Sequence, residues 1–403
     1  AALALRVSAS APALMRPRDD EARTGALITR MGAVVQPKMS TESAQTLNVE
    51  SARAMLDDSG RAKILERLRA RTESAGRSDL ITDLDSIDEA MRNLHGQGSA
   101  ARLSPVQYIQ LEALVALTNR PALPVTERET PDLRRVQTVD SGHPSLGGFG
   151  VAVNTRLADL ENGPLAAVGR IDADWMHVGT GFLVRPDLIM TNRHVLEELA
   201  SPLPRAESPT RWQLTRMATI DFSPSGYDPL RRFQIVEVAF AGAHPIKGWP
   251  IRFDNLDLAL LRIETSNTEG GKAPQPVSAV KNPGWRAGAA NLFVVGYPAP
   301  PSYVPLDEHG AERQDVLARL REIFGLRYRE KYFAPGMVLR FDASWVFEHD
   351  ATTLGGNSGS LIGTLEGGLS AAGLHFAGDW LRANYAHDLA LARASDPQLH
   401  AML

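Results

Sequence analysis

The spacing of hydrophobic and polar positions divides the chain into two parts. Residues 41–123 place Leu, Ile, Met and Ala at helical intervals among charged residues, with little Pro or Gly, which is typical of amphipathic helices. The clearest predicted helix begins at Ser104, which forms a capping box with Gln107, and ends at Arg120 before a proline. A second covers residues 61–75. We therefore predict an α-helical N-terminal region whose apolar faces serve packing.

Beyond residue 150 the pattern changes to short apolar runs separated by Gly and Pro turns, which indicates an all-β domain over residues 151–403. The clearest predicted strands are the runs 177–184, 233–240, 256–263 and 291–295. A charged stretch at helical spacing, residues 307–331, is predicted to be a surface helix inserted between strands. Residues 124–150 are rich in Pro, Gly and Thr without periodicity and are predicted to form a linker or wrapping segment. We expect residues 1–40 to be disordered.

Composition excludes several classes of function. The chain has no cysteine, so disulfides, thiol catalysis and thiolate metal sites are ruled out. Its net charge of −4 leaves no excess of Lys and Arg to neutralise phosphates, and we expect no nucleic-acid partner. Its histidines and carboxylates do not show the spacing of metal ligands, so we expect no metal and no cofactor.

The sequence also bears on the compartment. No apolar run approaches the roughly 20 residues that a membrane-spanning helix needs, so we expect a soluble protein. The Ala-rich start, residues 1–13, is only faintly similar to the end of a secretory signal and lacks a leading Met and a basic beginning. A cytoplasmic location is therefore slightly favoured over secretion.

One serine stands in a glycine-rich turn, Gly355-Gly356-Asn357-Ser358-Gly359-Ser360. Glycines permit a sharp turn that exposes the hydroxyl of Ser358. The same turn can direct the backbone N–H groups of Gly356 and Ser358 toward one point, as an oxyanion hole requires. This composition is also common in ordinary turns, so the motif alone does not define the chemistry.

A serine hydroxyl needs a neighbouring base, and His194 has the best setting among the ten histidines. It follows an apolar run that closes with polar residues, as expected at a strand end that faces a cleft. A comparable setting is missing around His177, His244, His349 and His387. Asp257 opens the apolar run 257–263 and can orient the imidazole, with Asp254 in a polar turn as the alternative. Each residue taken alone also has a structural explanation: His194 as a packed histidine, and Asp257 as an aspartate that caps a strand.

In the chain order His, Asp, Ser these residues resemble the triad of trypsin-like double-barrel serine peptidases. Three blocks carry the resemblance: Thr191-Asn192-Arg193-His194-Val195, the Asp strand Asn255-Leu256-Asp257-Leu258-Ala259-Leu260-Leu261, and the serine turn. Gly296-Tyr297-Pro298 and Gly373-Leu374-His375-Phe376-Ala377-Gly378 are similar as well, especially to the bacterial glutamyl-endopeptidase branch. The resemblance spans residues 167–386 and leaves the helical N-terminal region outside.

The resemblance implies an all-β fold of two six-stranded antiparallel barrels, preceded by the mainly α-helical region, with the triad at the junction of the barrels. His194 and Asp257 would come from the first barrel and Ser358 from the second. It also implies a serine endopeptidase that acts on a protein or peptide substrate through an acyl-enzyme. Asn357 stands where digestive members carry Asp, so activation through an ion pair with a new N-terminus is not expected.

The substrate pocket is implied to be lined by Thr352, Thr353, Gly373, His375 and Gly378. Thr352 stands at the position of the acid in Lys/Arg-specific members, so we expect no strong preference for a cationic side chain. Thr353 and His375 match the residues that bind the substrate carboxylate in glutamyl endopeptidases, and cleavage after Glu or Asp is the expected preference. The alternative is a purely structural His375 beside an apolar pocket.

A different class of function is a catalytically silent scaffold that keeps the barrels and uses the helical region for binding. In either case the N-terminal helical region is expected, by analogy with other attached modules, to bind a regulator or the peptidase domain itself.

Overall fold

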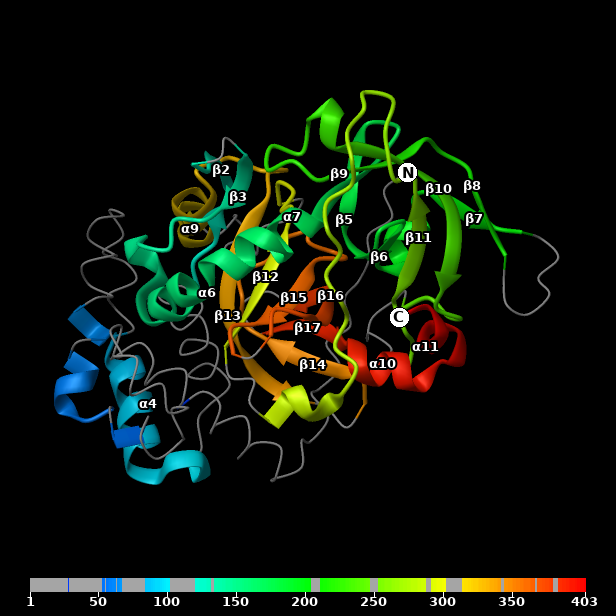
Figure 1. Cartoon of the computed structure of the whole chain (residues 1–403). Coiled ribbons are helices and arrows are strands. Elements are labelled where there is room, and N and C mark those ends of the chain that lie inside the picture. Colours follow the sequence, from blue (N-terminus) through cyan, green and yellow to red (C-terminus); the bar gives the residue numbers. More distant parts are fainter. Residues whose placement is uncertain are drawn as a thin grey trace, which may run out of the picture.

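The computed structural model places two barrels side by side, with helices at their margins (Figure 1). It describes residues 120–403 except 132–133, 204–210, 247–252, 288–290, 302–313, 342–343, 367 and 380–382. Before these it describes residues 28, 53–54, 56–62, 64–66 and 84–101. The expected disorder of residues 1–40 and the predicted helix from Ser104 therefore lie outside the described residues, apart from Ile28 and Arg120. The described part of the N-terminal region includes one long helix, α4 (Leu84–Gln97).

The first barrel is closed by six antiparallel strands in the order β10-β11-β6-β5-β4-β9. These are β4 (Val168–Ala173), β5 (Met176–Arg185), β6 (Leu188–Thr191), β9 (Ala218–Asp221), β10 (Arg232–Ala241) and β11 (Ala259–Ile263). Their apolar runs supply a core in which Phe182, Ile189 and Leu260 are fully buried. The predicted run 256–263 is a strand only from Ala259, so Asp257 precedes the strand.

The second barrel is formed by β12 (Asn291–Gly296), β13 (Tyr332–Phe341), β14 (Val346–His349), β15 (Leu361–Thr364), β16 (Ala371–Asp379) and β17 (Ala383–Asp388). Their order is β13-β12-β15-β16-β17-β14, and pairing between β13 and β14 closes the ring. The fold predicted from the family resemblance, two six-stranded antiparallel barrels, is thus confirmed. The short β1 (Leu123–Pro124) adds to the outside of β13.

Helices and small sheets surround the barrels. They are β2 (Thr126–Glu129), β3 (Arg135–Thr138), α6 (Gly150–Asn162), α7 (Pro164–Ala167), α8 (Arg193–Leu196), β7 (Ala200–Pro202), β8 (Trp212–Leu214), α9 (Gln314–Phe324), α10 (Leu389–Ser395) and α11 (Pro397–Met402). Short stretches of 3-10 helix cover Gly98–Ala100, Pro144–Phe149, Pro229–Arg231 and Pro283–Ala287. α9 lies within the charged stretch 307–331 that predicted a helix between strands. Within the described residues, none of the helices combines the length and apolar character needed to cross a membrane.

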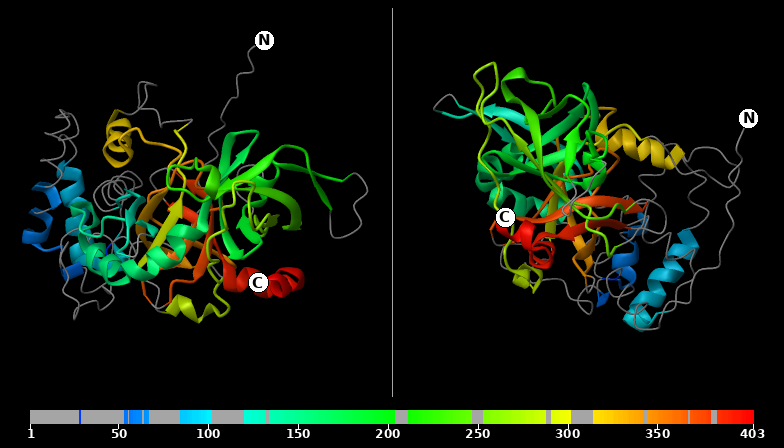
Figure 2. Two further views of the ribbon diagram at one scale, coloured as in Figure 1. Left: turned by 45° about the horizontal axis from the view of Figure 1, so that its top comes forward. Right: turned by 90° about the vertical axis from the view of Figure 1, so that its right-hand side faces the viewer.

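The segment before the first barrel packs on both barrels. Through β1 it pairs with the second barrel, where Leu123 faces Phe333 across the ladder. Through Gln137, whose Nε2 donates to the carbonyl oxygen of Phe222 at 2.7 Å, it reaches the end of β9 in the first barrel. The two views of Figure 2 show this region lying against the barrels while the N-terminal helices stand to one side.

A buried lysine joins this segment to both barrels. The ammonium group of Lys331, fully buried, donates to Gln137 Oε1 at 2.5 Å and to the carbonyl oxygens of Leu165 and Phe222 at 2.7 and 2.9 Å. An ammonium group has three donors and no acceptor, so three acceptors match it fully. The ring of Tyr297 lies under the same Nζ at 5.6 Å. Burial lowers the pKa of Lys331 well below its usual value.

Candidate active site

His194 and Asp257 lie beside the ends of two neighbouring strands of the first barrel. β6 ends at Thr191 and α8, which carries His194, follows at once. Asp257 lies shortly before β11, which begins at Ala259. Because Thr191 is paired with Ala259 in the barrel, the end of β6 and the start of β11 lie side by side. The two candidate side chains therefore meet at one rim of the barrel.

The carboxylate of Asp257 holds His194 through two hydrogen bonds. Oδ2 accepts from the ring Nδ1 at 2.6 Å, and Oδ1 accepts from the backbone N–H of His194 at 2.9 Å. The carboxylate is 1% exposed and the imidazole 34% exposed, so the ring reaches from a buried acid to the surface. A proton on Nδ1 leaves Nε2 as the basic atom of the neutral ring. The alternative acid, Asp254, lies on an exposed turn.

A histidine of the second barrel also contacts Asp257. Its backbone N–H donates to Nε2 of His387 in β17 at 3.0 Å. His387 is fully buried and stacks on the ring of Phe376 with centroids 4.2 Å apart. Burial lowers the pKa of His387 to about 4, so the ring is neutral at pH 7 and can accept this bond. No local pattern marked His387 as a site residue, because its partner Asp257 is 130 residues away in the sequence.

The turn that carries Ser358 requires its glycines. Gly356 and Gly359 have φ of +84° and +88°, a region that residues with a Cβ rarely adopt. A Cβ at Gly359 would lie 1.9 Å from the carbonyl oxygen of Thr180. The glycine pattern noted in the sequence therefore reflects both backbone conformation and close approach to the first barrel.

Thr180 in β5 attaches this turn to the first barrel. Its Oγ1 donates to the carbonyl oxygen of Gly356 at 2.7 Å, and its N–H donates to that of Ser358 at 2.8 Å. Next to it, a Cβ at Gly179 would lie 2.7 Å from Val195 Cγ2 and 3.2 Å from the carbonyl oxygen of Ser358. The serine turn and the residue after His194 therefore flank the same glycine.

The residues expected to line the pocket lie in several different settings. Thr353 Oγ1 donates to Oδ1 of Asn384 at 2.8 Å, and a Cβ at Gly378 would lie 2.3 Å from the same oxygen. The structure thus brings Thr353 and Gly378 together at Asn384. Gly373 instead packs in the barrel core, where a Cβ would lie 2.7 Å from Cζ of Phe347. Thr352 Oγ1 donates to the carbonyl oxygen of Arg120 at 2.6 Å.

His375 belongs to a pair of buried histidines. Its Nδ1 lies 3.3 Å from Nε2 of His349, and the rings meet edge to face. Burial, His349 and the nearby His194 lower the pKa of His375 well below its usual value, and burial lowers that of His349 to about 4. Both rings are therefore neutral at pH 7. His349 ends a strand, as His194 was predicted to do, and that signal could have drawn attention to it.

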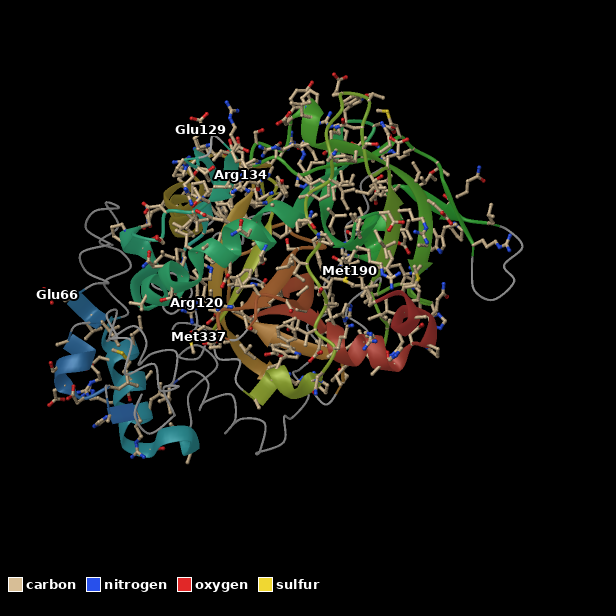
Figure 3. All side chains as sticks on the ribbon, viewed as in Figure 1. Glu66, Arg120, Glu129, Arg134, Met190 and Met337 are labelled. Carbon is tan, nitrogen blue, oxygen red and sulfur yellow. The ribbon has the colours of Figure 1, made fainter. Side chains whose placement is uncertain are left out.

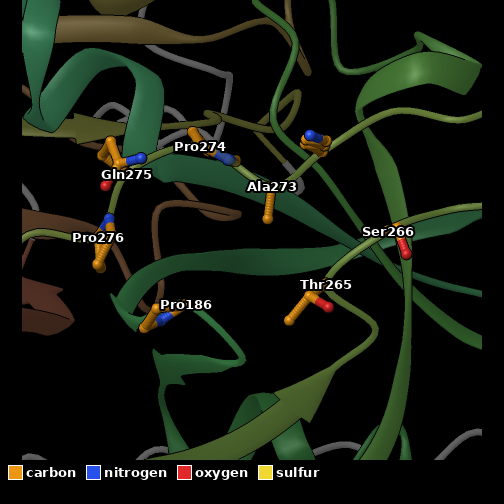
Figure 4. A pocket seen from close by; sticks show the side chains of 8 residues that line it. Pro186, Thr265, Ser266, Ala273, Pro274, Gln275 and Pro276 are labelled. Atoms are coloured by element: carbon orange, nitrogen blue, oxygen red, sulfur yellow. The ribbon is translucent and has the colours of Figure 1, made fainter.

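A surface cavity lies elsewhere, at the opposite end of β6 and β11 (Figure 4). It is lined by Pro186, Thr265, Ser266, Lys272, Ala273, Pro274, Gln275 and Pro276. Leu188 faces Arg262 at that end of the ladder, whereas Thr191 faces Ala259 at the end near His194. In the described part of the chain, no three His, Asp or Glu side chains are grouped in a way that could hold a metal ion.

One of the two closed antiparallel barrels carries the histidine–aspartate pair, and the other contributes a glycine-bounded serine turn that is attached beside that pair. This fold and this site define a serine peptidase of the double-barrel class. Residues 179–371 match the family model of the trypsin-like peptidase domain. The chain is 32% identical over 278 residues to a probable serine protease of Lysobacter enzymogenes, covering 63% of this chain and 68% of that protein. The chain belongs to the trypsin-like serine peptidases.

Two solved structures also show similarity to this chain. A Glu endopeptidase in complex with MPD is 17% identical, with a TM-score of 0.37, and the match covers 61% of this chain and 94% of that chain. Deg5 is 19% identical, with a TM-score of 0.35, and the match covers 59% of this chain and 90% of that chain.

Proposed function

We propose that the protein is a serine endopeptidase whose catalytic triad is His194, Asp257 and Ser358. The observation that carries this proposal is the pairing of a buried carboxylate with Nδ1 of a partly exposed histidine at 2.6 Å. That pairing leaves Nε2 as a base, and a trypsin-like peptidase has a serine as its nucleophile. Ser358 is the candidate because its turn lies beside Val195 across Gly179.

The roles follow from these positions. Ser358 attacks the carbonyl carbon of the scissile peptide bond while Nε2 of His194 accepts the hydroxyl proton. The imidazolium that forms is stabilised by Asp257 and then donates its proton to the leaving amine. Water, deprotonated by the same imidazole, releases the acyl group and regenerates the serine. Asp257 accepts the hydrogen bond from Nδ1 throughout and holds the ring in the tautomer that the reaction needs.

The proposed oxyanion hole consists of the backbone N–H groups of Gly356 and Ser358. The carbonyl oxygen of Gly355 accepts from the N–H of Ala299 at 2.6 Å, and that of Asn357 accepts from the N–H of Ser360 at 2.9 Å. In a trans peptide the N–H points opposite to the C=O. Both carbonyl groups are thus held away from the site, which supports N–H groups fixed before the reaction begins.

We propose a preference for Glu or Asp on the acyl side of the cleaved bond. His375 and His349 offer two linked imidazoles that are neutral at rest. A substrate carboxylate beside His375 favours a protonated ring, which then donates to it. Asp350, the carboxylate beside His349 among the described residues, is already paired with Arg120 at 2.6 Å, so it does not favour a cationic substrate.

The test is cleavage of a mixed peptide library by the full chain and by Ser358→Ala, with cut sites mapped by mass spectrometry. Ser225→Ala, on an exposed turn, is the matched control. We expect cuts after Glu and Asp that disappear only in Ser358→Ala. Equal cutting by Ser358→Ala would exclude the proposed nucleophile, and cuts after Lys or Arg would exclude the proposed preference. Absence of both cleavage and covalent labelling of Ser358 would favour the silent scaffold.

A further inference from the structure

A buried arginine fastens the start of the segment before the first barrel to the turn that leads into Ser358. Arg120 is 1% exposed, and its Nη2 donates to Oδ2 of Asp350 at 2.6 Å. Asp350 follows β14 directly and is itself fixed, because its Oδ1 accepts from the N–H of Met337 at 2.7 Å. Figure 3 labels Arg120 and Met337, which lie near each other at this side of the second barrel.

The backbone of Arg120 makes a second contact with the same turn. Thr352 Oγ1 donates to the carbonyl oxygen of Arg120 at 2.6 Å. The guanidinium group also lies over the ring of Phe149 at 5.2 Å. Shortly after Arg120, β1 pairs with β13, which fixes the chain that carries it. Arg120 thus contacts two positions of one turn: Asp350 through its side chain and Thr352 through its backbone carbonyl oxygen.

The far side of this turn is held by Asn384 of β17. Its Nδ2 donates to the carbonyl oxygen of Ala351 at 2.7 Å, and its Oδ1 accepts from Thr353. The turn then continues into the serine loop, where the N–H of Asn357 donates to the carbonyl oxygen of Leu354 at 3.1 Å. Residues 350–353 therefore lie between Arg120 on one side and Asn384 on the other, immediately before the proposed nucleophile.

We propose that Arg120 is a positioning residue for substrate specificity, which builds one wall of the pocket without contacting the substrate. This inference rests on the proposed function, because residues 352 and 353 are the proposed pocket wall. A buried ion pair holds its geometry better than an exposed one, since solvent neither screens it nor competes for its hydrogen bonds. The segment before the first barrel is thus part of the specificity apparatus of the peptidase.

The experiment uses the full chain carrying Arg120→Met or Thr352→Val. Arg128→Met is the matched control, because Arg128 lies in the same segment and pairs with Glu161. Two readouts are compared. The first is kcat and KM for a peptide with Glu at the cleaved position and for the same peptide with Ala. The second is the rate of labelling by diisopropyl fluorophosphate, a small reagent that reports the nucleophile without needing the pocket.

For Arg120→Met we expect KM for the Glu peptide to rise about tenfold, with the preference for Glu over Ala reduced by a similar factor. Labelling should stay within about twofold of wild type, and Thr352→Val should change KM in the same direction by about threefold. Arg128→Met should resemble wild type.

Unchanged selectivity in Arg120→Met and Thr352→Val would overturn the inference. So would a loss of labelling that parallels the loss of cleavage in a variant whose circular dichroism spectrum matches that of wild type, because the effect would then reach the nucleophile and not the pocket alone. If Arg120→Met does not fold, Thr352→Val decides. If wild type itself is not labelled, the proposed function fails, and the inference fails with it.

Discussion

Replacing Asp257 by asparagine changes the charge of one buried side chain and keeps its shape. In the native protein Oδ1 accepts from the backbone N–H of His194 at 2.9 Å and Oδ2 accepts from Nδ1 at 2.6 Å. The asparagine must keep its oxygen toward the backbone N–H, so its NH₂ group faces the ring. Nδ1 must then be an acceptor, which moves the ring proton to Nε2. A ring that carries a proton on Nε2 cannot accept one from Ser358.

The size of the effect follows from this change of tautomer. An asparagine at the acid position of such a triad lowers kcat by about 10⁴, which corresponds to about 5.4 kcal/mol of transition-state stabilisation. The carboxylate is 1% exposed, so solvent has little access to supply an alternative partner for the ring. In the variant both hydrogen bonds can form again, the one to Nδ1 with donor and acceptor exchanged, so we expect it to fold.

The assay is kcat for the best peptide found in the library, with Asp254→Asn as the control because Asp254 is exposed and three residues away. Far-ultraviolet circular dichroism checks the fold of each variant. We expect Asp254→Asn to resemble wild type. The reasoning is refuted if folded Asp257→Asn keeps more than about a tenth of the wild-type kcat, or if Asp254→Asn loses as much as Asp257→Asn.

Four further predictions concern the contacts around the triad. His387→Leu removes the acceptor of the Asp257 N–H, and we expect a fall in kcat of about tenfold or more that His387→Gln partly restores. Thr180→Val removes the hydroxyl that attaches the serine turn to β5, and kcat should fall while Thr180→Ser stays close to wild type. Lys331→Met leaves buried acceptors unpaired and should lower the free energy of unfolding by about 2–5 kcal/mol, measured by urea denaturation. Burial lowers the pKa of His349 to about 4, so the stability from its neutral form is complete above pH of about 6.5 and is lost as pH falls through about 4. That loss is on the order of 3 kcal/mol, and urea titrations between pH 7 and pH 4 should be flatter for His349→Gln.

Structural features that are determined by residues adjacent in the sequence could be predicted. The apolar runs 177–184, 233–240 and 291–295 lie within β5, β10 and β12, because alternation and turn residues are local properties. The glycines around Ser358 were recognisable for the same reason, since positive φ is a property of single positions. His194 and Asp257 could be selected because each adjoins an apolar run.

Contacts between distant parts of the chain were not predictable in this way. Arg120 and Asp350 are 230 residues apart, and Lys331 and Gln137 are 194 residues apart. From the sequence alone, a charged residue that is buried in the fold cannot be distinguished from an exposed one, because its partner is distant along the chain. The close approach of Gly373 to Phe347 in the core of the second barrel is another contact that the sequence pattern does not reveal.

Two long-range contacts at the candidate site share one arrangement, in which each half of the site is held by the other barrel. Asp257 belongs to the first barrel, and its N–H is held by His387 of the second. Ser358 belongs to the second barrel, and its carbonyl oxygen is held by Thr180 of the first. A shift of one barrel against the other would therefore move base and nucleophile apart, and a displacement of about 1 Å can cost a hundredfold in rate. Lys331 bonds to both the first barrel and the preceding segment, so this segment bears on the same docking that aligns the proposed triad.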